Sequence, residues 1–248
     1  MSAVLRTSES ATRASASDYE LYTTRLDLMP RAVRALAELL SEDEQQRASR
    51  LVFQRDRARF IVARARLRQL LGARLGVSPA SVEFSYGARG KPALAARFAD
   101  CGVRFNVSHS EDVAVYGFAA DREVGVDVEA VRELPDADEI AARCFSVREY
   151  EAYLALAAHD RPLGFFSCWT RKEAFIKAIG DGLSQSLERF DVSLAPGEPA
   201  KILRVGGRAG EHCGWRLQAF APAPGFVAAI VIEAPSICRG DTGPSVGS

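Results

Sequence analysis

The sequence predicts an α+β fold made of two similar halves, and the order of its hydrophobic patterns is the main reason. Helical patterns come first and strand patterns follow, and this order then repeats along the chain. Strands and helices do not alternate one by one, so a doubly wound parallel sheet is not expected. With 248 residues, of which 48% are hydrophobic, the chain can bury one large core or two smaller ones.

After one short strand, the first part of the chain is expected to place three helices before its other strands. The predicted elements are a short strand at 24–28, helices at 31–40, from 42 to about 53 and at 55–75, and strands at 82–84, 104–107, 113–118 and 124–129. Ser41 and Glu44 have the spacing of a capping box, which favours a helix start at this point. In the longest helix, apolar residues recur at helical spacing and arginines occupy the other faces.

The second part repeats the order. The predicted elements are helices at 136–143, from 146 onward and at 163–179, and strands at 190–194, 201–205, 215–220 and 226–232. Ser146 and Glu149 again suit a capping box, and Gly180 and Gly182 are expected to end the last helix.

Both chain ends have the composition of loose tails. Residues 1–18 are rich in Ser, Ala and Thr and lack the apolar segment of a secretory signal, so a disordered tail is expected, with a transit peptide as the alternative. Residues 235–248 are rich in Gly, Pro and Ser and are expected to form a second loose tail.

Charge and cysteine usage argue against several classes of protein. The 32 basic residues balance the 32 acidic ones, which gives no reason to expect a nucleic-acid or membrane-surface partner. The five cysteines are scattered, so reduced thiols and a cytoplasmic location are expected rather than a disulfide framework or a zinc site. The sequence holds no apolar run near the roughly 20 residues that a membrane-spanning helix needs.

Two carboxylates in one strand are the first candidates for chemistry. In the alternating run from Val124 to Glu129, a period of two puts Asp127 and Glu129 on one face and the valines on the other. Neighbouring carboxylates repel each other unless a cation joins them, and Mg²⁺ prefers such oxygen ligands. The alternative that this motif alone leaves open is the solvent-facing side of a half-buried strand.

Three further groups could assist phosphate chemistry. Glu173 and Lys177 stand four residues apart on one helix face, where a plain surface ion pair is the alternative. His109 lies between two serines in a predicted turn, a position that a structural histidine can also occupy. Positive charge is concentrated in the arginines between residues 47 and 68, along with Gly90-Lys91-Pro92. Arginine suits phosphate binding, although an arginine-rich helix is usually just solvated. The phosphate loops GxGxxG and GxxxxGK[ST] are absent from the sequence.

Taken in this order, the segments resemble the Sfp-type 4'-phosphopantetheinyl transferases. The matching pieces are Gly90-Lys91-Pro92, Phe105 to Ser110, Gly125 to Glu129, Phe145-Ser146 with Glu149 and Tyr150, and Trp169 to Lys177. Each piece is weak alone, but the ordered combination is specific for the family. The resemblance implies a pseudo-dimer of two similar α/β halves, covering residues 19–121 and 122–234, with the active site in the cleft between them.

The resemblance also implies a set of site residues. The implied ligands of Mg²⁺ are Asp127, Glu129 and Glu173. The implied coenzyme A contacts are Arg59, Lys91 and Pro92 of the GKP turn, Ser108, His109, Lys172 and Lys177, with Arg47 and Arg50 as looser candidates for the 3'-phosphate. The expected catalytic residues are Glu173, Lys177 and His109, with Glu173 as the base.

The implied reaction moves the 4'-phosphopantetheine group of coenzyme A to a serine hydroxyl of an apo acyl or peptidyl carrier protein and releases 3',5'-ADP. Service to polyketide or nonribosomal peptide synthesis is a further expectation, and so is a monomer, because a fused pseudo-dimer completes its site within one chain. Two alternatives stay open: a non-catalytic protein that binds coenzyme A or a carrier, and a metal-dependent phosphohydrolase in which water replaces the serine.

Overall fold

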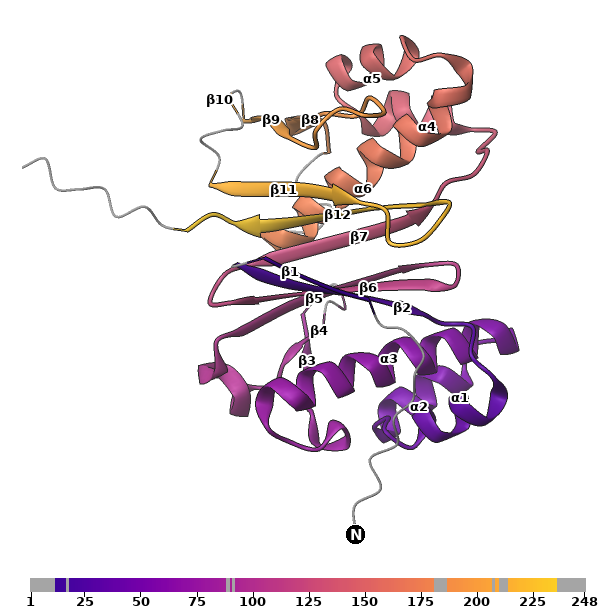
Figure 1. Ribbon diagram of the computed structural model, residues 1–248, viewed down its shortest axis with the longest axis vertical. Helices are drawn as coiled ribbons and strands as arrows, with labels where there is room; N and C mark the ends of the chain where they lie inside the picture. Colours follow the sequence, from indigo (N-terminus) through magenta and orange to yellow (C-terminus); the bar gives the residue numbers. More distant parts are fainter. Residues whose placement is uncertain are drawn as a thin grey trace, which may run out of the picture.

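Two antiparallel sheets lie face to face across the middle of the protein, and helices cover their outer faces (Figure 1). The computed structural model describes residues 12–16, 18–87, 90, 92–180, 187–206, 208–209 and 214–235. The two sheets pack through a shared layer of apolar side chains, so the layers follow the order helix, sheet, sheet, helix. This mixed fold with two sheet-rich halves confirms the α+β prediction.

The first half places a four-stranded sheet on three helices. The sheet has the order β1-β2-β6-β5, formed by Thr12–Ala16, Tyr19–Arg25, Val113–Ala120 and Val103–Ser110. The other elements are α1 (Pro30–Ala37), α2 (Glu42–Ser49), α3 (Gln54–Leu75), the paired strands β3 (Phe84–Tyr86) and β4 (Pro92–Leu94), and 3-10 turns at Pro79–Ser81 and Ala96–Cys101. The predicted capping box is present at α2, where Glu44 accepts a hydrogen bond from the Ser41 N–H over 3.1 Å.

The second half places a three-stranded sheet against one long helix. The sheet has the order β11-β12-β7, formed by Trp215–Phe220, Phe226–Glu233 and Val124–Ala130. The other elements are α4 (Ala137–Cys144), α5 (Val147–Leu154), α6 (Arg161–Ile179), 3-10 turns at Ala158–Asp160 and Leu187–Arg189, and a small sheet of β8 (Phe190–Val192), β9 (Ile202–Val205) and β10 (Arg208–Ala209).

In the second half, helices begin and end at the capping and glycine residues that the sequence indicates. The capping box of Ser146 and Glu149 begins α5. Gly180 ends α6 with φ at 77°, a left-handed conformation that glycine adopts without a steric penalty, while Gly182 lies outside the described residues. Among the described helices, none is both long enough and apolar enough to cross a membrane.

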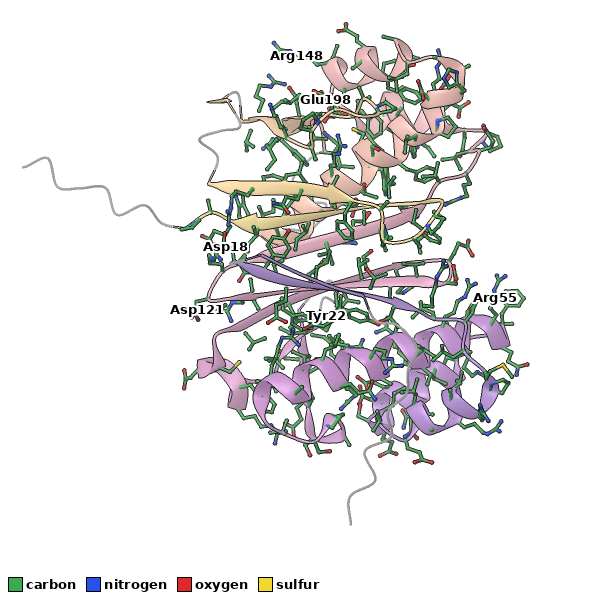
Figure 2. The ribbon with its side chains drawn as sticks, viewed as in Figure 1. Asp18, Tyr22, Arg55, Asp121, Arg148 and Glu198 are labelled. Carbon is green, nitrogen blue, oxygen red and sulfur yellow. The ribbon has the colours of Figure 1, made fainter. Side chains whose placement is uncertain are left out.

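The two halves are joined along the neighbouring edge strands β5 and β7. Asn106 on β5 accepts the backbone N–H of Val126 on β7 over 2.9 Å, so a side chain replaces the usual backbone partner. Just before the start of β7, Arg122 donates a hydrogen bond to the backbone carbonyl of Asp18, which is labelled in Figure 2. The Asp18 carboxylate pairs with Arg216 on β11. The junction therefore brings polar groups of both halves next to each other.

Several sequence predictions differ from the structure. Residues 12–16 pair with β2 as strand β1, so the prediction of a disordered tail over 1–18 is wrong for this segment, whose backbone groups find partners in β2. Strand β2 begins earlier than the predicted 24–28, and the strand predicted at 82–84 begins at residue 84. The rest of the predicted tails, residues 1–11, 17 and 236–248, lies outside the described residues.

Candidate active site

The two carboxylates of β7 lie on one face of the strand, as its alternation predicts. Val124, Val126 and Val128 are buried between the two sheets, and the carboxylates take the other face. Asp127 is only 4% exposed, whereas Glu129 is half-buried. The strand therefore carries one buried and one more accessible carboxylate.

The lack of a side chain at Gly125 lets α6 lie directly against β7. A Cβ at this position would come within 2.1 Å of the Ala174 carbonyl oxygen and 2.4 Å of the Ala178 nitrogen. Real atoms do not approach so closely, so the helix needs glycine here to reach the strand. This approach brings α6 residues 173 and 177 next to the carboxylates of β7.

Glu173 and Lys177 lie one turn apart on α6 and bring opposite charges to the same place. Lys177 donates from Nζ to Asp127 Oδ1 over 2.6 Å and to Ser108 Oγ over 3.2 Å. Glu173 is half-buried and interacts electrostatically with both carboxylates of β7. The structure thus brings together the three acidic residues and the lysine that the sequence singled out.

Strand β5 supplies a hydroxyl to each carboxylate of β7. Ser108 Oγ donates to Asp127 Oδ1 over 2.8 Å, and Ser110 Oγ donates to Glu129 Oε2 over 2.8 Å. The sequence assigns Ser108 to coenzyme A, but in the structure its buried hydroxyl bonds to Asp127. Sequence reasoning missed Ser110 and Asn106, although polar residues at every second position of this strand were a usable signal.

Negative charge is concentrated in this cluster. Burial raises the pKa of Glu173; Lys177 acts against that rise, and the charges of Asp127 and Glu129 add to it. Burial also raises the pKa of Glu129, against the hydrogen bond from Ser110 and with added repulsion from Asp127. A cation among these groups would relieve the repulsion.

The carboxylate oxygens of the cluster fit a divalent cation whose coordination shell is completed by a bound ligand. Oδ2 of Asp127 is buried without a hydrogen-bond partner among the described residues, and a bound cation would satisfy it. In the part of the chain that the structure describes, no three His, Cys, Asp or Glu side chains form a ready-made metal site. Mg²⁺ usually takes one or two protein carboxylates and fills its shell with water and phosphate oxygens. One or two of the carboxylates of Asp127, Glu129 and Glu173 therefore suit an Mg²⁺ site that a phosphate-bearing substrate would complete.

His109 and Arg59 border the cluster on the side of the first half. Loss of surrounding water lowers the pKa of His109, and the positive charges of Lys177 and Arg59 lower it further, which favours the neutral imidazole although the residue is exposed at the surface. Arg59 donates to Asp27 Oδ1 over 2.8 Å and to Glu111 Oε2 over 3.1 Å. These two acids raise the pKa of Arg59 and hold its guanidinium in place.

Lys172 does not face this cluster, so the prediction that it contacts coenzyme A is wrong for this arrangement. Its Nζ is buried, where it donates to the two oxygens of Glu149 over 2.8 and 2.5 Å and to the Phe190 carbonyl over 2.7 Å. Glu149 also accepts the Val192 N–H over 2.7 Å. One step along a helix rotates a side chain by about 100°, so Lys172 and its neighbour Glu173 point to different sides of α6. Sequence reasoning identified Glu149 as a helix cap and as part of a family motif, but missed its bond to the lysine.

The remaining predicted coenzyme A contacts are not joined to the cluster by any interaction among the described residues. Lys91 itself lies outside the described residues, and Pro92 begins β4 and is half-buried. Arg47 is exposed on α2 with its guanidinium carbon 5.6 Å from the centre of the Phe60 ring, and Arg50 is exposed at the end of the same helix. Contacts of these residues with coenzyme A stay a prediction.

Known proteins match this chain along most of its length. A family model for the N-terminal part of 4'-phosphopantetheinyl transferases matches residues 29–121, and a model for the 4'-phosphopantetheinyl transferase superfamily matches residues 123–231. The 4'-phosphopantetheinyl transferase HetI of Nostoc sp. is 39% identical over 215 residues, which cover 87% of each chain. The chain belongs to the 4'-phosphopantetheinyl transferase superfamily.

A second relative in this superfamily is the 4'-phosphopantetheinyl transferase psf-1 of Bacillus pumilus, 31% identical over 163 residues, covering 66% of this chain and 67% of its own. Among solved structures, the holo-[acyl-carrier-protein] synthase (AcpS) of Thermotoga maritima covers 45% of this chain and 62% of its own, at 23% identity and a TM-score of 0.33, too partial a likeness to carry an argument. The family predicted from the ordered motifs is confirmed.

The clustered residues of this transferase come from both matched segments. Ser108 and Ser110 fall in the N-terminal match, while the three carboxylates and Lys177 fall in the second. The cluster therefore depends on how the two halves are joined.

Proposed function

We propose that this chain transfers the 4'-phosphopantetheine group of coenzyme A to a serine hydroxyl of apo acyl or peptidyl carrier proteins and releases 3',5'-ADP. The observation that supports this most directly is the cluster of Asp127, Glu129, Glu173 and Lys177. It places three carboxylates and the lysine ammonium at the junction of the halves. Membership in the superfamily supplies the reaction class. We extend the proposal to a role in polyketide or nonribosomal peptide synthesis, in the cytoplasm.

In the proposed reaction, the carrier serine oxygen bonds to the phosphorus that carries pantetheine. The bond from that phosphorus to the bridging oxygen breaks, and 3',5'-ADP leaves with the electron pair. The serine proton must pass to a base, and Glu173 is the candidate. Burial raises the pKa of this carboxylate toward the working pH, where a general base is most effective, and it lies one helical turn from Lys177.

Charge that builds on the phosphates needs donors that are already in place. Lys177 is part-exposed, so its ammonium can donate to a phosphate oxygen while Asp127 stays close behind it. The neutral His109 can donate one N–H to a phosphate oxygen at the edge of the cluster. Mg²⁺, held by Asp127, Glu129 and Glu173, would supply further neutralisation of the coenzyme A phosphates.

The binding of coenzyme A is proposed to use arginines of the first half. Arg59 already holds two carboxylates, so binding a phosphate would exchange or share those partners. Arg47, Arg50 and Lys91 with Pro92 are proposed to contact the nucleotide end of coenzyme A. Because both halves of the site belong to one chain, we also propose that the enzyme is a monomer, which light scattering coupled to size exclusion would test.

Intact-mass spectrometry of a carrier protein tests the function. An apo carrier incubated with this chain, coenzyme A and Mg²⁺ should gain the mass of one phosphopantetheine group, and EDTA should prevent the gain. Glu173→Gln and Asp127→Asn should abolish it, whereas Glu198→Gln, a control at an exposed acid between β8 and β9 (Figure 2), should not.

Each failure of this experiment has a distinct meaning. No gain on acyl and peptidyl carriers alike would contradict the proposal and favour a protein that only binds coenzyme A or a carrier. Release of 3',5'-ADP without any carrier would instead identify a phosphohydrolase.

A further inference from the structure

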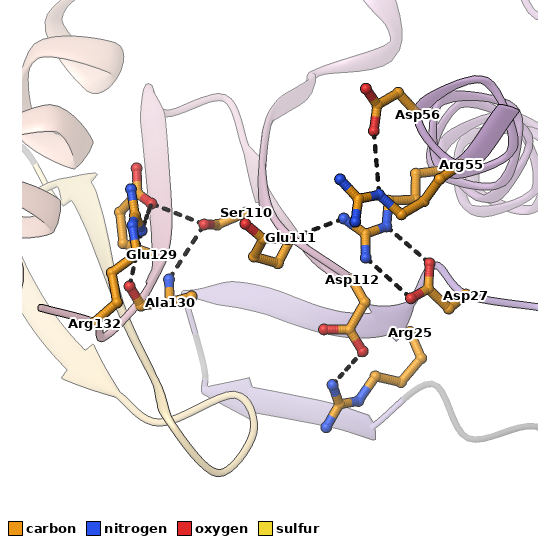
Figure 3. A network of polar contacts seen from close by, with 11 residues as sticks. Arg25, Asp27, Arg55, Asp56, Ser110, Glu111, Asp112, Glu129, Ala130 and Arg132 are labelled. Atoms are coloured by element: carbon orange, nitrogen blue, oxygen red, sulfur yellow. Dashed lines mark hydrogen bonds and ion pairs between the residues drawn. The ribbon is translucent and has the colours of Figure 1, made fainter. Parts of the chain in front are cut away.

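Ser110 is the last residue of β5, and its hydroxyl makes two bonds to β7. Its Oγ donates to Glu129 Oε2 over 2.8 Å and accepts the backbone N–H of Ala130 over 3.2 Å (Figure 3). The hydroxyl can make both bonds at once, because it donates its single proton to Glu129 while a lone pair accepts the N–H of Ala130. Arg132 lies 3.8 Å from the same Oε2 atom. Both contacts thus fall on one oxygen of Glu129, and Oε1 takes part in neither.

The neighbouring carboxylate is held in the same manner. Ser108 Oγ and Lys177 Nζ both bond to Asp127 Oδ1, while Oδ2 is buried with no hydrogen-bond partner among the described residues. Two serines, two residues apart on β5, therefore each engage one oxygen of the two carboxylates that alternate on β7. The repeated pattern keeps one oxygen of each carboxylate occupied by the protein.

The turn after Ser110 is anchored so that the serine cannot easily move. Glu111 has φ at 47°, a conformation that a residue with a side chain rarely adopts, and its carboxylate is held by Arg59 over 3.1 Å. The next residue, Asp112, pairs with Arg25, and its carbonyl accepts the Leu26 N–H over 2.7 Å. Figure 3 shows the pair of Asp112 and Arg25 beside the bond from Ser110 to Glu129.

We propose that Ser110 is a positioning residue, which holds Glu129 by one oxygen so that the other is presented to the divalent cation. Ser110 itself contacts neither the cation nor coenzyme A. The inference rests on the proposed function, because it requires a cation at Glu129. Partners that orient a metal-binding carboxylate commonly contribute about 10-fold or more to metal affinity.

The test measures metal binding apart from turnover, with Mn²⁺ as the probe. Free Mn²⁺ is followed by electron paramagnetic resonance during titration of the protein with coenzyme A present and no carrier, so no transfer takes place. Ser110→Ala should weaken Mn²⁺ binding by about 10-fold. Ser110→Thr keeps the hydroxyl and should keep most of the affinity. Ser85→Ala, at an exposed serine of β3, is the matched control and should bind as the wild type does.

Two further readouts separate positioning from folding. The melting temperature of Ser110→Ala in EDTA should stay close to that of the wild type. In the transfer assay, the variant should need more Mg²⁺ for half its maximal rate, while kcat at saturating Mg²⁺ approaches the wild-type value.

The outcomes distinguish this inference from the function on which it rests. If the wild type binds Mn²⁺ and Ser110→Ala binds it equally well, the positioning role is wrong and the transferase proposal stands. If Ser110→Thr loses as much affinity as Ser110→Ala, the hydroxyl is not the operative group and the inference fails. If the wild type binds no Mn²⁺ with coenzyme A present, the proposed metal site fails and takes the role of Ser110 with it.

Discussion

Lys177 on α6 and Asp127 on β7 are joined over 2.6 Å, and they differ sharply in exposure. The side chain of Asp127 is 5% exposed and that of Lys177 is 29% exposed, so the carboxylate lies in the interior while part of the lysine side chain reaches solvent. The lysine can therefore serve a bound phosphate without leaving the vicinity of Asp127.

Removing this ammonium should slow transfer far more than it disturbs folding. For Lys177→Ala we expect a loss on the order of 10² to 10³ in the rate of carrier modification, because a preorganised donor to the phosphates is lost. The measurement is the time course of carrier mass at saturating coenzyme A. Lys201→Ala, at an exposed lysine before β9, is the control. A Lys177→Ala rate within a few-fold of the control would remove Lys177 from the proposed chemistry.

A single methyl group at residue 125 should separate α6 from β7. Gly125→Ala places a Cβ 2.1 Å from the Ala174 carbonyl oxygen, so the helix must shift or the fold must weaken. Overpacking of this kind costs roughly 1 to 3 kcal/mol in the free energy of unfolding, which denaturation followed by circular dichroism would measure. Gly87→Ala meets no atom within 4 Å and should be nearly neutral. Equal stability of the two variants would contradict the close contact.

The sequence could predict those parts of the site that local patterns determine. A period of two placed Asp127 and Glu129 together, and helical spacing placed Glu173 and Lys177 together. Their convergence depends on the contact at Gly125, which no local pattern reveals. The motif order of a known family supplied that information.

Two errors show where local patterns fail. Helical spacing does not say which side of α6 faces the cluster, because α6 is buried on several sides, and Lys172 proved to be satisfied by Glu149 in the core. Strand β1 has the composition of a loose tail and gains its structure from antiparallel pairing with the adjoining strand β2, a partner that composition alone does not reveal.

Breaking the buried pair of Lys172 and Glu149 should reduce stability rather than coenzyme A binding. Lys172→Met leaves Glu149 buried without its cation, a change that typically costs about 3 to 5 kcal/mol. Chemical denaturation would measure this loss, and calorimetric titration of the folded variant with coenzyme A should give a near wild-type affinity. The double variant Glu149→Gln/Lys172→Met should lose less stability than the sum of the losses in the two single variants, because the residues share one interaction. Full additivity, or a selective loss of coenzyme A binding, would restore Lys172 to the ligand site.

The raised pKa values of Glu173 and Glu129 predict that the metal-free protein is least stable when both are ionised. Burial lets the folded state hold these protons more tightly than the unfolded chain does. Their favourable contribution is therefore complete below the unfolded-state pKa of about 4.3 and declines as the pH rises through the raised folded-state values. Glu173→Gln removes one of the two charges, so at about pH 8 in EDTA it should melt at a higher temperature than the wild type.

The sign of the difference in melting temperature between Glu173→Gln and the wild type distinguishes a buried carboxylate in a negatively charged cluster from an ordinary surface carboxylate. Scanning calorimetry from about pH 4 to pH 8 should show the advantage of Glu173→Gln growing with pH, while Glu198→Gln tracks the wild type throughout. Mg²⁺ with coenzyme A should stabilise the wild type and leave Glu173→Gln less affected, because the variant lacks one candidate ligand. A Glu173→Gln protein that melts below the wild type at alkaline pH without metal would mean that Lys177 already compensates Glu173, and the cluster would then have no need of a cation.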